Sequence, residues 1–155
     1  MPKPKYGWDS CVFITVLTGE QRDPEEIAAL MEVIDAADRA NATIVTSTVT
    51  LSEVLDDDMS PTVSTQLELL FRRPNFIRFD VSAAVATRAR EIRQAARKSG
   101  RSIQTPDAQH LATALAVGVD AFHTFDDKLL RLDGSSIVGG LRVCKPQGSQ
   151  TVLGL

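Results

Sequence analysis

Hydrophobic and polar positions follow two spacings along this chain, and the two alternate from one end to the other. Apolar side chains three and four residues apart predict amphipathic helices, and short β-branched runs predict strands. The predicted helices span residues 10–18, 23–40, about 48 onward, 60–72, 81–99, 105–117 and 127–132. The predicted strands end at Trp8 and span residues 43–47, 76–79, 121–124 and, as a candidate edge strand, 141–143. This alternation predicts an α/β fold, with a central, mostly parallel sheet of four to five strands between helical layers.

Two of the predicted helices carry clear start signals and apolar faces. Asp23 and Pro24 are typical of a helix start, and Asp80 is expected to cap the helix over residues 81–99. The faces expected to be buried comprise Ile27, Leu30, Met31, Ile34 and Ala37 in the first helix, and Val81, Val85, Ala89, Ile92 and Ala96 in the second.

The length and composition indicate one globular domain. The chain has 155 residues, 43% hydrophobic and 24% charged, which is enough to bury a full core. We expect one domain over residues 1–145 and a loosely held tail over residues 146–155. No apolar run approaches the ~20 residues that a membrane-spanning helix needs. Neither a secretory signal nor a disulfide pair is indicated, so a cytoplasmic protein is expected.

Four acidic residues stand where an α/β fold places its functional groups. Asp9, Asp107 and Asp126 each lie at the end of a predicted strand or the start of a predicted helix. Glu53 lies inside a helix among apolar neighbours. Helix capping would explain any one of these aspartates alone. Taken together, four acids at the carboxyl edge of a sheet predict a site for Mg²⁺ or Mn²⁺, which prefer carboxylate and water oxygens.

Other charged residues have simpler interpretations. Asp56, Asp57 and Asp58 are consecutive, so they cannot all face one ion, and a solvated helix end is expected there. His110 lies one turn after Asp107 and could reach the site, but a buried histidine with satisfied hydrogen bonds is the expectation.

A stripe of arginines on the helix over residues 81–99 has two interpretations. Arg90, Arg93 and Arg97 recur every three or four residues. They are either solvated charges of an amphipathic helix or a face that follows the phosphates of a nucleic acid. The net charge of −3 argues against a strongly basic surface, although a clustered acidic site would mask one.

Four short motifs together resemble the PIN domain family, and in size the chain resembles the toxin ribonucleases of VapC type. The motifs are Trp8-Asp9-Ser10, residues 48–54 (TVTLSEV), residues 105–114 (TPDAQHLATA) and Thr124-Phe125-Asp126. Together they extend over most of the chain, from about residue 6 to residue 132.

This resemblance implies a three-layer α/β/α sandwich and Mg²⁺- or Mn²⁺-dependent cleavage of RNA that leaves a 5′-phosphate and a 3′-hydroxyl. It gives catalytic and metal-binding roles to Asp9, Glu53, Asp107 and Asp126, and supporting roles to the hydroxyls of Ser10 and Thr124. Asp127 is an alternative to Asp126, because the two acids are adjacent. A cognate antitoxin and a homodimer are the expected protein partners.

Several other functions are compatible with parts of the sequence. A housekeeping PIN-type RNA-processing nuclease would carry the same four acids, and a non-catalytic member of the fold would only bind RNA or a partner. A Mg²⁺-binding phosphoryl switch domain needs an acid pair after strand one and a lysine after a late strand, whereas Asp9 stands alone and Lys128 lies in a predicted helix. A haloacid-dehalogenase-like phosphatase needs a second aspartate where Cys11 stands.

Overall fold

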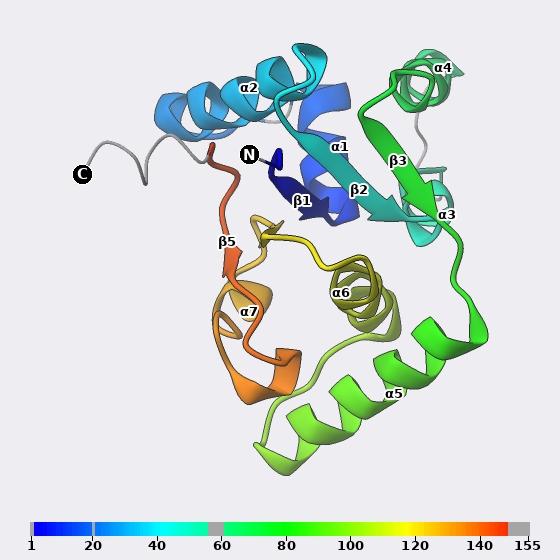
Figure 1. The fold of residues 1–155 in the computed structure, drawn as a ribbon, viewed down its shortest axis with the longest axis vertical. Coiled ribbons are helices and arrows are strands. Elements are labelled where there is room, and N and C mark those ends of the chain that lie inside the picture. The colour runs from blue at the N-terminus through cyan, green and yellow to red at the C-terminus, as the bar shows by residue number, and fades with distance from the viewer. Residues whose placement is uncertain (1, 20, 56–60, 149–155) are drawn as a thin grey trace.

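A computed structural model describes residues 2–19, 21–55 and 61–148 of the protein (Figure 1). Its centre is a five-stranded sheet in the order β3-β2-β1-β4-β5, in which every neighbouring pair is parallel. The strands are β1 Lys5–Trp8, β2 Thr43–Ser47, β3 Phe76–Phe79, β4 Ala121–His123 and β5 Val143–Cys144. The predicted parallel α/β fold is therefore confirmed.

Helices cover both faces of this sheet (Figure 1). One layer contains α1 Ser10–Thr18, α2 Pro24–Asp38, α3 Val49–Leu55 and α4 Pro61–Phe71. The other contains α5 Ala83–Lys98, α6 Thr105–Val117, α7 Asp127–Leu130 and the 3₁₀ turn Ser136–Val138. Each face has its own apolar core: Trp8, Phe13 and Ile44 lie in the first, and Ile92, Leu111 and Phe122 lie in the second. The molecule is thus a three-layer sandwich.

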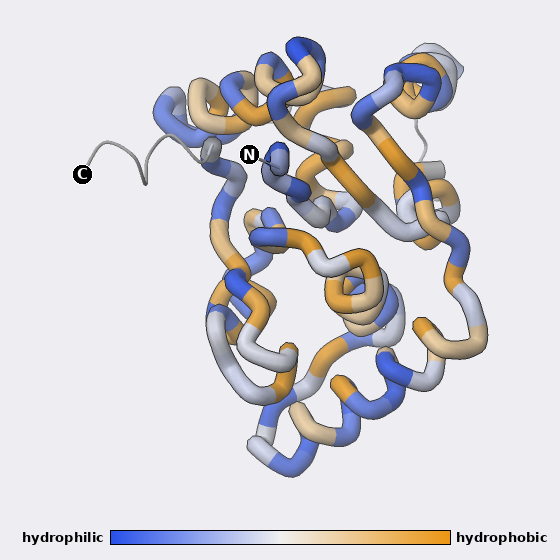
Figure 2. The backbone as a smooth tube through the Cα atoms, in the orientation of Figure 1, coloured by the Kyte–Doolittle hydropathy of each residue, from blue (hydrophilic) through white to orange (hydrophobic). Residues whose placement is uncertain are grey.

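Hydropathy along the backbone matches this layering (Figure 2). Strands β2 and β3 contain strongly hydrophobic positions, the central strand β1 is hydrophilic to neutral on this scale, and α5 alternates between hydrophilic and hydrophobic positions. Val85, Ala89, Ile92 and Ala96 form the buried side of α5, as predicted. No helix in the described ranges is both long and apolar enough to cross a membrane.

Two local predictions were wrong. Met31 was placed on the buried face of α2, but it is 54% exposed, and Val33 is buried instead. Position 31 lies about 100° around the helix from Leu30, outside the stripe that packs on the sheet. Asp80 does not cap α5; the chain stays extended after β3, and the Ser82 hydroxyl accepts a 3.2 Å hydrogen bond from the Val85 amide. The triplet at 56–58 lies outside the described residues.

Close packing of α6 on β1 depends on Gly7. A Cβ atom at this position would lie 3.2 Å from the Ala114 Cβ and 3.2 Å from a ring carbon of Phe122. Such contacts are tighter than ordinary van der Waals packing. The absence of a side chain at Gly7 therefore lets α6, which carries Asp107, approach the central strand.

A buried histidine lies between the two central strands. His123 on β4 accepts a 3.1 Å hydrogen bond at Nδ1 from the Trp8 indole and stacks on Tyr6, with ring centroids 4.6 Å apart. Burial, and secondarily the charge of Arg142, lowers the pKa of His123 to about 3. This imidazole is therefore neutral at physiological pH and belongs to the core of the domain.

Candidate active site

The candidate site is built where the carboxyl ends of neighbouring strands meet. Asp9 directly follows β1, and the segment 124–126 directly follows β4, the strand paired with β1. Glu53 lies on α3, which follows β2 on the other side of β1. Asp107 lies in the first turn of α6. Strand order thus brings acids far apart in sequence to one edge of the sheet.

Asp9 is the most deeply buried acid of the set, at 3% exposure. It is the N-cap of α1, and its Oδ1 accepts hydrogen bonds from the Val12 amide at 3.4 Å and from the Cys11 thiol at 2.8 Å. Its Oδ2 accepts a 2.6 Å hydrogen bond from the Thr124 hydroxyl. Burial raises the pKa of Asp9, and these hydrogen bonds only partly oppose that shift.

Thr124 links Asp9 to the next acid. Its hydroxyl oxygen accepts a 3.0 Å hydrogen bond from the Asp126 amide, and Oδ1 of Asp126 accepts one of 2.8 Å from the Lys128 amide. Asp126 is therefore the N-cap of α7, whereas Asp127 is the exposed first residue of that helix. Through the two hydrogen bonds of Thr124, Asp126, the residue that matches the Thr-x-Asp motif, is linked to Asp9.

The pKa of Asp107 is influenced by the other three acids. Its pKa is raised to about 6, first by burial and then by the charges of Asp9, Asp126 and Glu53. Neighbouring like charges disfavour the ionised form of a carboxyl and so raise its pKa. Asp127 is not among the main causes of this shift.

Glu53 is held by a histidine. Nε2 of His110 lies 2.7 Å from Oε1 of Glu53, and the two side chains are 1% and 29% exposed. Burial acts to raise the pKa of Glu53, but the hydrogen bond and charge of His110, together with a hydrogen bond to Ser10, outweigh it and lower that pKa. Glu53 is therefore kept ionised beside three other acids.

A pocket of about 200 Å³ opens beside these acids. Asp107 and Asp126 line it together with Lys128, and the segment between α5 and α6 supplies Ser102, Ile103 and Gln104. A cation at the rim of an acidic pocket is suited to contacting the phosphate of an approaching ligand.

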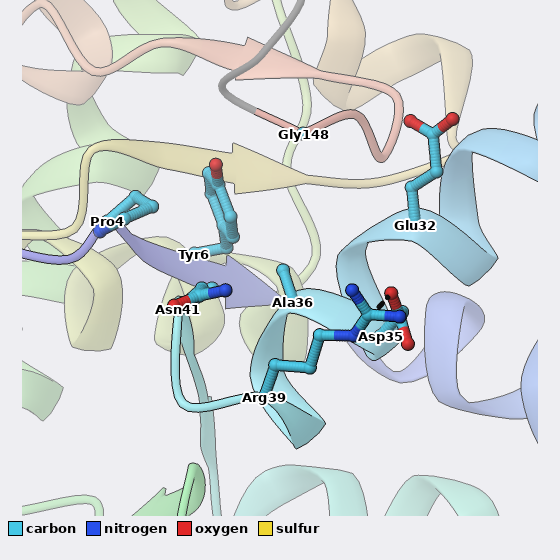
Figure 3. A pocket seen from close by; sticks show the side chains of 9 residues that line it. Pro4, Tyr6, Glu32, Asp35, Ala36, Arg39, Asn41 and Gly148 are labelled. Carbon is cyan, nitrogen blue, oxygen red and sulfur yellow. Dashed lines mark ion pairs between the residues drawn. The ribbon is translucent and has the colours of Figure 1, made fainter.

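A second hollow, of about 260 Å³, lies at the opposite end of β1 (Figure 3). Pro4 and Tyr6 line it from the start of that strand, and Asp35 and Arg39 line it from α2 as a 3.2 Å ion pair. It contains none of the predicted site residues. The Tyr6 hydroxyl is buried and has no hydrogen-bond partner in the described structure, so it is not exposed to a ligand in this hollow.

The donor chemistry of the first site fits a hard divalent cation. Within residues 2–19, 21–55 and 61–148, no three His, Cys, Asp or Glu side chains are already arranged as the ligands of one ion. The oxygens of Asp9 and Glu53 are instead held by Thr124, Cys11 and His110. Nonetheless, the carboxylates of these acids offer the oxygen ligands that Mg²⁺ or Mn²⁺ prefers, and burial together with the neighbouring acids raises the pKa of Asp107.

Comparison with known proteins identifies the fold family. The family model described as PIN domain matches residues 8–135, a span that contains all four acids. The chain belongs to the PIN domain family. A comparison with curated proteins gives no significant match.

Solved structures of the same fold support this assignment at low sequence identity. VapBC2 from Rickettsia felis, bound to a DNA fragment from its promoter, has a TM-score of 0.67 and 16% identity over 90% of this chain and 96% of that one. VapC20 from Mycobacterium tuberculosis, a toxin that cleaves the sarcin-ricin loop, has a TM-score of 0.61 and 14% identity over 88% and 96%. A toxin-antitoxin complex from Klebsiella pneumoniae has a TM-score of 0.56 and 19% identity over 83% and 90%.

The predicted arginine stripe is only partly free in this PIN domain. Arg90 and Arg97 are exposed on α5. The Arg93 Nε donates a 3.0 Å hydrogen bond to the Ile103 carbonyl and so fixes the segment that leads into α6. A role for these arginines in binding RNA remains a prediction.

Three residues of the site were not identified as functional from the sequence. Cys11 donates to Asp9, His110 contacts Glu53, and Lys128 lines the pocket. Two of them carried a local signal, since Cys11 lies two residues after Asp9 and His110 lies three residues after Asp107 on the same helix. Lys128 lies two residues after Asp126, but its place beside Asp107 in one pocket depends on the tertiary structure.

Proposed function

We propose that this PIN domain is a Mg²⁺- or Mn²⁺-dependent endoribonuclease and the toxin of a type II toxin–antitoxin pair. The single observation that carries the proposal is the convergence of Asp9, Glu53, Asp107 and Asp126 at one sheet edge, where their charges act on one another. The structural likeness to VapC20 and to the toxin-antitoxin complexes supports the choice of RNA as substrate and of an antitoxin as partner.

In this proposal each acid has a role that follows from its position. Asp9, Asp107 and Asp126 would hold the ion through carboxylate oxygens, and Glu53 would ligate it or orient the attacking water. Ser10 and Thr124 hydrogen-bond to Glu53 and Asp9 respectively and so fix two of the four carboxylates. Mg²⁺ or Mn²⁺, when bound, supplies a water of lowered pKa and relieves charge on the phosphoryl oxygens.

The surrounding charges determine how RNA would approach. Lys128 at the pocket rim is placed to pair with a phosphate next to the cleaved bond. Arg90, Arg93 and Arg97 lie on α5, the helix that packs on α6, and would contact phosphates farther along the strand. Cations that contact phosphates supply most of the salt-dependent affinity for nucleic acid.

A cognate antitoxin and a second copy of the chain are the protein partners we propose. The exposed large apolar side chains of the described structure are Met31, Leu69, Ile77 and Phe79. Ile77 and Phe79 lie on β3, an edge strand whose outer side is unpaired in the sheet. Edge strands with exposed apolar groups are common places for protein contact.

Cleavage assays with purified protein, freed of any antitoxin, test the proposed function. Single-stranded or looped RNA should be cut with Mn²⁺ or Mg²⁺, and EDTA should stop the reaction. Asp107→Asn and Asp126→Asn should abolish cleavage, whereas the matched control Asp127→Asn, on the exposed neighbour, should stay near wild type. Cleavage that continues undiminished in chelator would contradict the proposal. Cleavage confined to the maturation sites of a precursor RNA would favour a housekeeping nuclease.

A further inference from the structure

An imidazole lies inside the acidic site, and the roles given to the four acids do not account for it. His110 is on α6, one turn after Asp107, and its side chain is 1% exposed. Nε2 lies 2.7 Å from Oε1 of Glu53, a short distance for a hydrogen bond between a ring nitrogen and a carboxylate. No substrate can reach a side chain this buried, so His110 cannot act on RNA directly.

A 2.7 Å hydrogen bond joins the two groups. An ionised carboxylate can only accept hydrogen bonds, so in a pair with ionised Glu53 the hydrogen lies on Nε2 of His110, which donates to Oε1. The other ring nitrogen, Nδ1, is buried and has no hydrogen-bond partner in the described structure. Of the two ring nitrogens, Nε2 is thus the one that the described structure shows hydrogen-bonded, and its partner is Glu53.

Glu53 is held in a different way from Asp9 and Asp126. Asp9 and Asp126 are short side chains that are fixed as helix N-caps by backbone amides. Glu53 has a longer side chain and lies near the end of the seven-residue helix α3. Its carboxylate is held by other side chains, His110 and Ser10.

Because His110 and Asp107 are on the same helix, the bond to Glu53 fixes one acid relative to another. Helix α6 is a rigid element seated on β1 and β2, and a contact from it sets the position of the Glu53 carboxylate relative to Asp107. Groups in contact with metal ligands commonly control the ligands' orientation, and removing them typically weakens metal affinity 10–100-fold.

We propose that His110 is a positioning residue: its Nε2–H holds Oε1 of Glu53 so that the carboxylate serves the metal ion and the attacking water. The inference rests on the proposed nuclease function and adds a residue to that site. Ser10 then supports the same carboxylate from α1, so that α1 and α6 together determine where Glu53 points.

The first measurement is the affinity of metal-free protein for Mn²⁺, which needs no turnover. His110→Leu removes the donor at similar volume and should weaken Mn²⁺ binding about tenfold or more. His110→Gln, whose amide can donate to Glu53, should recover most of that loss. The matched control is Thr113→Val, which removes a buried hydroxyl that bonds within the same helix, to the Gln109 carbonyl, and should leave Mn²⁺ affinity unchanged.

Kinetics and a double-mutant cycle then separate positioning from general stability. His110→Leu should lower kcat by about tenfold or more while KM for RNA stays near wild type. In a Glu53→Gln background the same substitution should have little further effect on Mn²⁺ affinity, because residues that act through one contact are not additive. Wild-type Mn²⁺ affinity in His110→Leu, or an equal loss with and without Glu53, would overturn the proposal.

A third measurement keeps the two proposals distinguishable. ¹⁵N chemical shifts of His110 in metal-free protein should report hydrogen on Nε2, and Glu53→Gln should perturb the Nε2 signal. A hydrogen on Nδ1 alone would overturn the positioning role, whatever the enzyme does. Intact Mn²⁺ binding without any RNA cleavage would overturn the nuclease function, and the role of His110 would still be decided by the affinity cycle.

Discussion

The Thr124 hydroxyl donates a 2.6 Å hydrogen bond to Oδ2 of Asp9, although the two residues are 115 positions apart. The same hydroxyl accepts a hydrogen bond from the Asp126 amide at 3.0 Å. One oxygen atom therefore joins the end of β1 to the start of α7. The link explains how two acids from opposite ends of the chain keep a constant separation.

Thr124→Val should damage both the site and the fold. Valine has a similar shape but no hydroxyl, so a buried carboxylate oxygen and the Asp126 amide would both lose a partner. We expect a loss of about 1–3 kcal/mol in the free energy of unfolding, measured by urea denaturation. RNA cleavage should also fall sharply. Thr124→Ser is the control, since it keeps the hydroxyl and should stay close to the wild type; a loss as large as that of Thr124→Val would show that the hydroxyl's hydrogen bonds are not what matters.

Asp107 should make the metal-free protein less stable as pH rises. Its pKa is about 6 in the folded protein and near 3.8 in an unfolded chain, so the folded state binds the proton more tightly. The stabilisation by this proton is complete below about pH 4 and is lost as pH rises through 6. Asp107→Asn should therefore equal or exceed the wild type in melting temperature at pH 8 in EDTA.

The comparison of melting temperatures at pH 4 and pH 8 isolates this effect. The melting temperature of the wild type should fall relative to that of Asp107→Asn between these pH values. Only the wild type has a carboxylate at position 107 that is repelled by the neighbouring acids at high pH. A variant strongly destabilised at pH 8 would show that Asp107 serves α6 mainly as a first-turn acid that complements the helix dipole.

His123 should make the protein sensitive to acid. Its pKa is about 3 when folded, compared with 6.5 in an unfolded chain. Its contribution to stability is complete above pH 6.5 and is lost as pH falls toward 3. Between these values the histidine binds a proton in the unfolded chain but not in the folded protein, which favours unfolding. At pH 4.5 the loss should be roughly 2–3 kcal/mol relative to neutral pH.

His123→Gln tests this contribution, since glutamine does not titrate. Urea denaturation at pH 7 and pH 4.5 should give a smaller difference for the variant than for the wild type, even if the variant is less stable overall. Parallel pH dependence of the two proteins would rule out His123 as a source of acid sensitivity.

The arginines of α5 should contribute to RNA affinity through salt-dependent contacts. Replacing Arg90, Arg93 and Arg97 together should weaken binding and flatten the plot of log affinity against log salt by about 0.7 per lost phosphate contact on a single strand. Metal affinity should not change. Because Arg93 also holds the Ile103 carbonyl, the double variant of Arg90 and Arg97 serves as the control that leaves this bond intact.

An unchanged salt dependence in both arginine variants would exclude the RNA role. Loss of affinity for the antitoxin in the same variants would then identify this face of α5 as a partner surface.

The sequence by itself determined the elements and their order. Strands β2 and β3 and helices α1 and α6 have the predicted bounds, because apolar period, Pro and Gly signals and N-caps act over only a few residues. The four acids were recognisable for a similar reason, since Asp9, Asp107 and Asp126 lie at junctions that local pattern marks and Glu53 belongs to the motif over residues 48–54. The same local view failed at Met31, where packing on the sheet decided burial, and at Asp80, where α5 begins later than predicted and Ser82 is its N-cap.

Only the tertiary structure decided which residues lie next to the four acids and how their pKa values change. The strand order β3-β2-β1-β4-β5 sets Asp9 beside Thr124, and the contact of α3 with α6 sets Glu53 beside His110, 57 residues away. Local patterns carry no information about which strands pair, because pairing is set by the burial of both sheet faces across the whole chain. The raised pKa of Asp107 and the lowered pKa of Glu53 arise from that arrangement, since the desolvation and the neighbouring charges that cause them exist only in the folded protein.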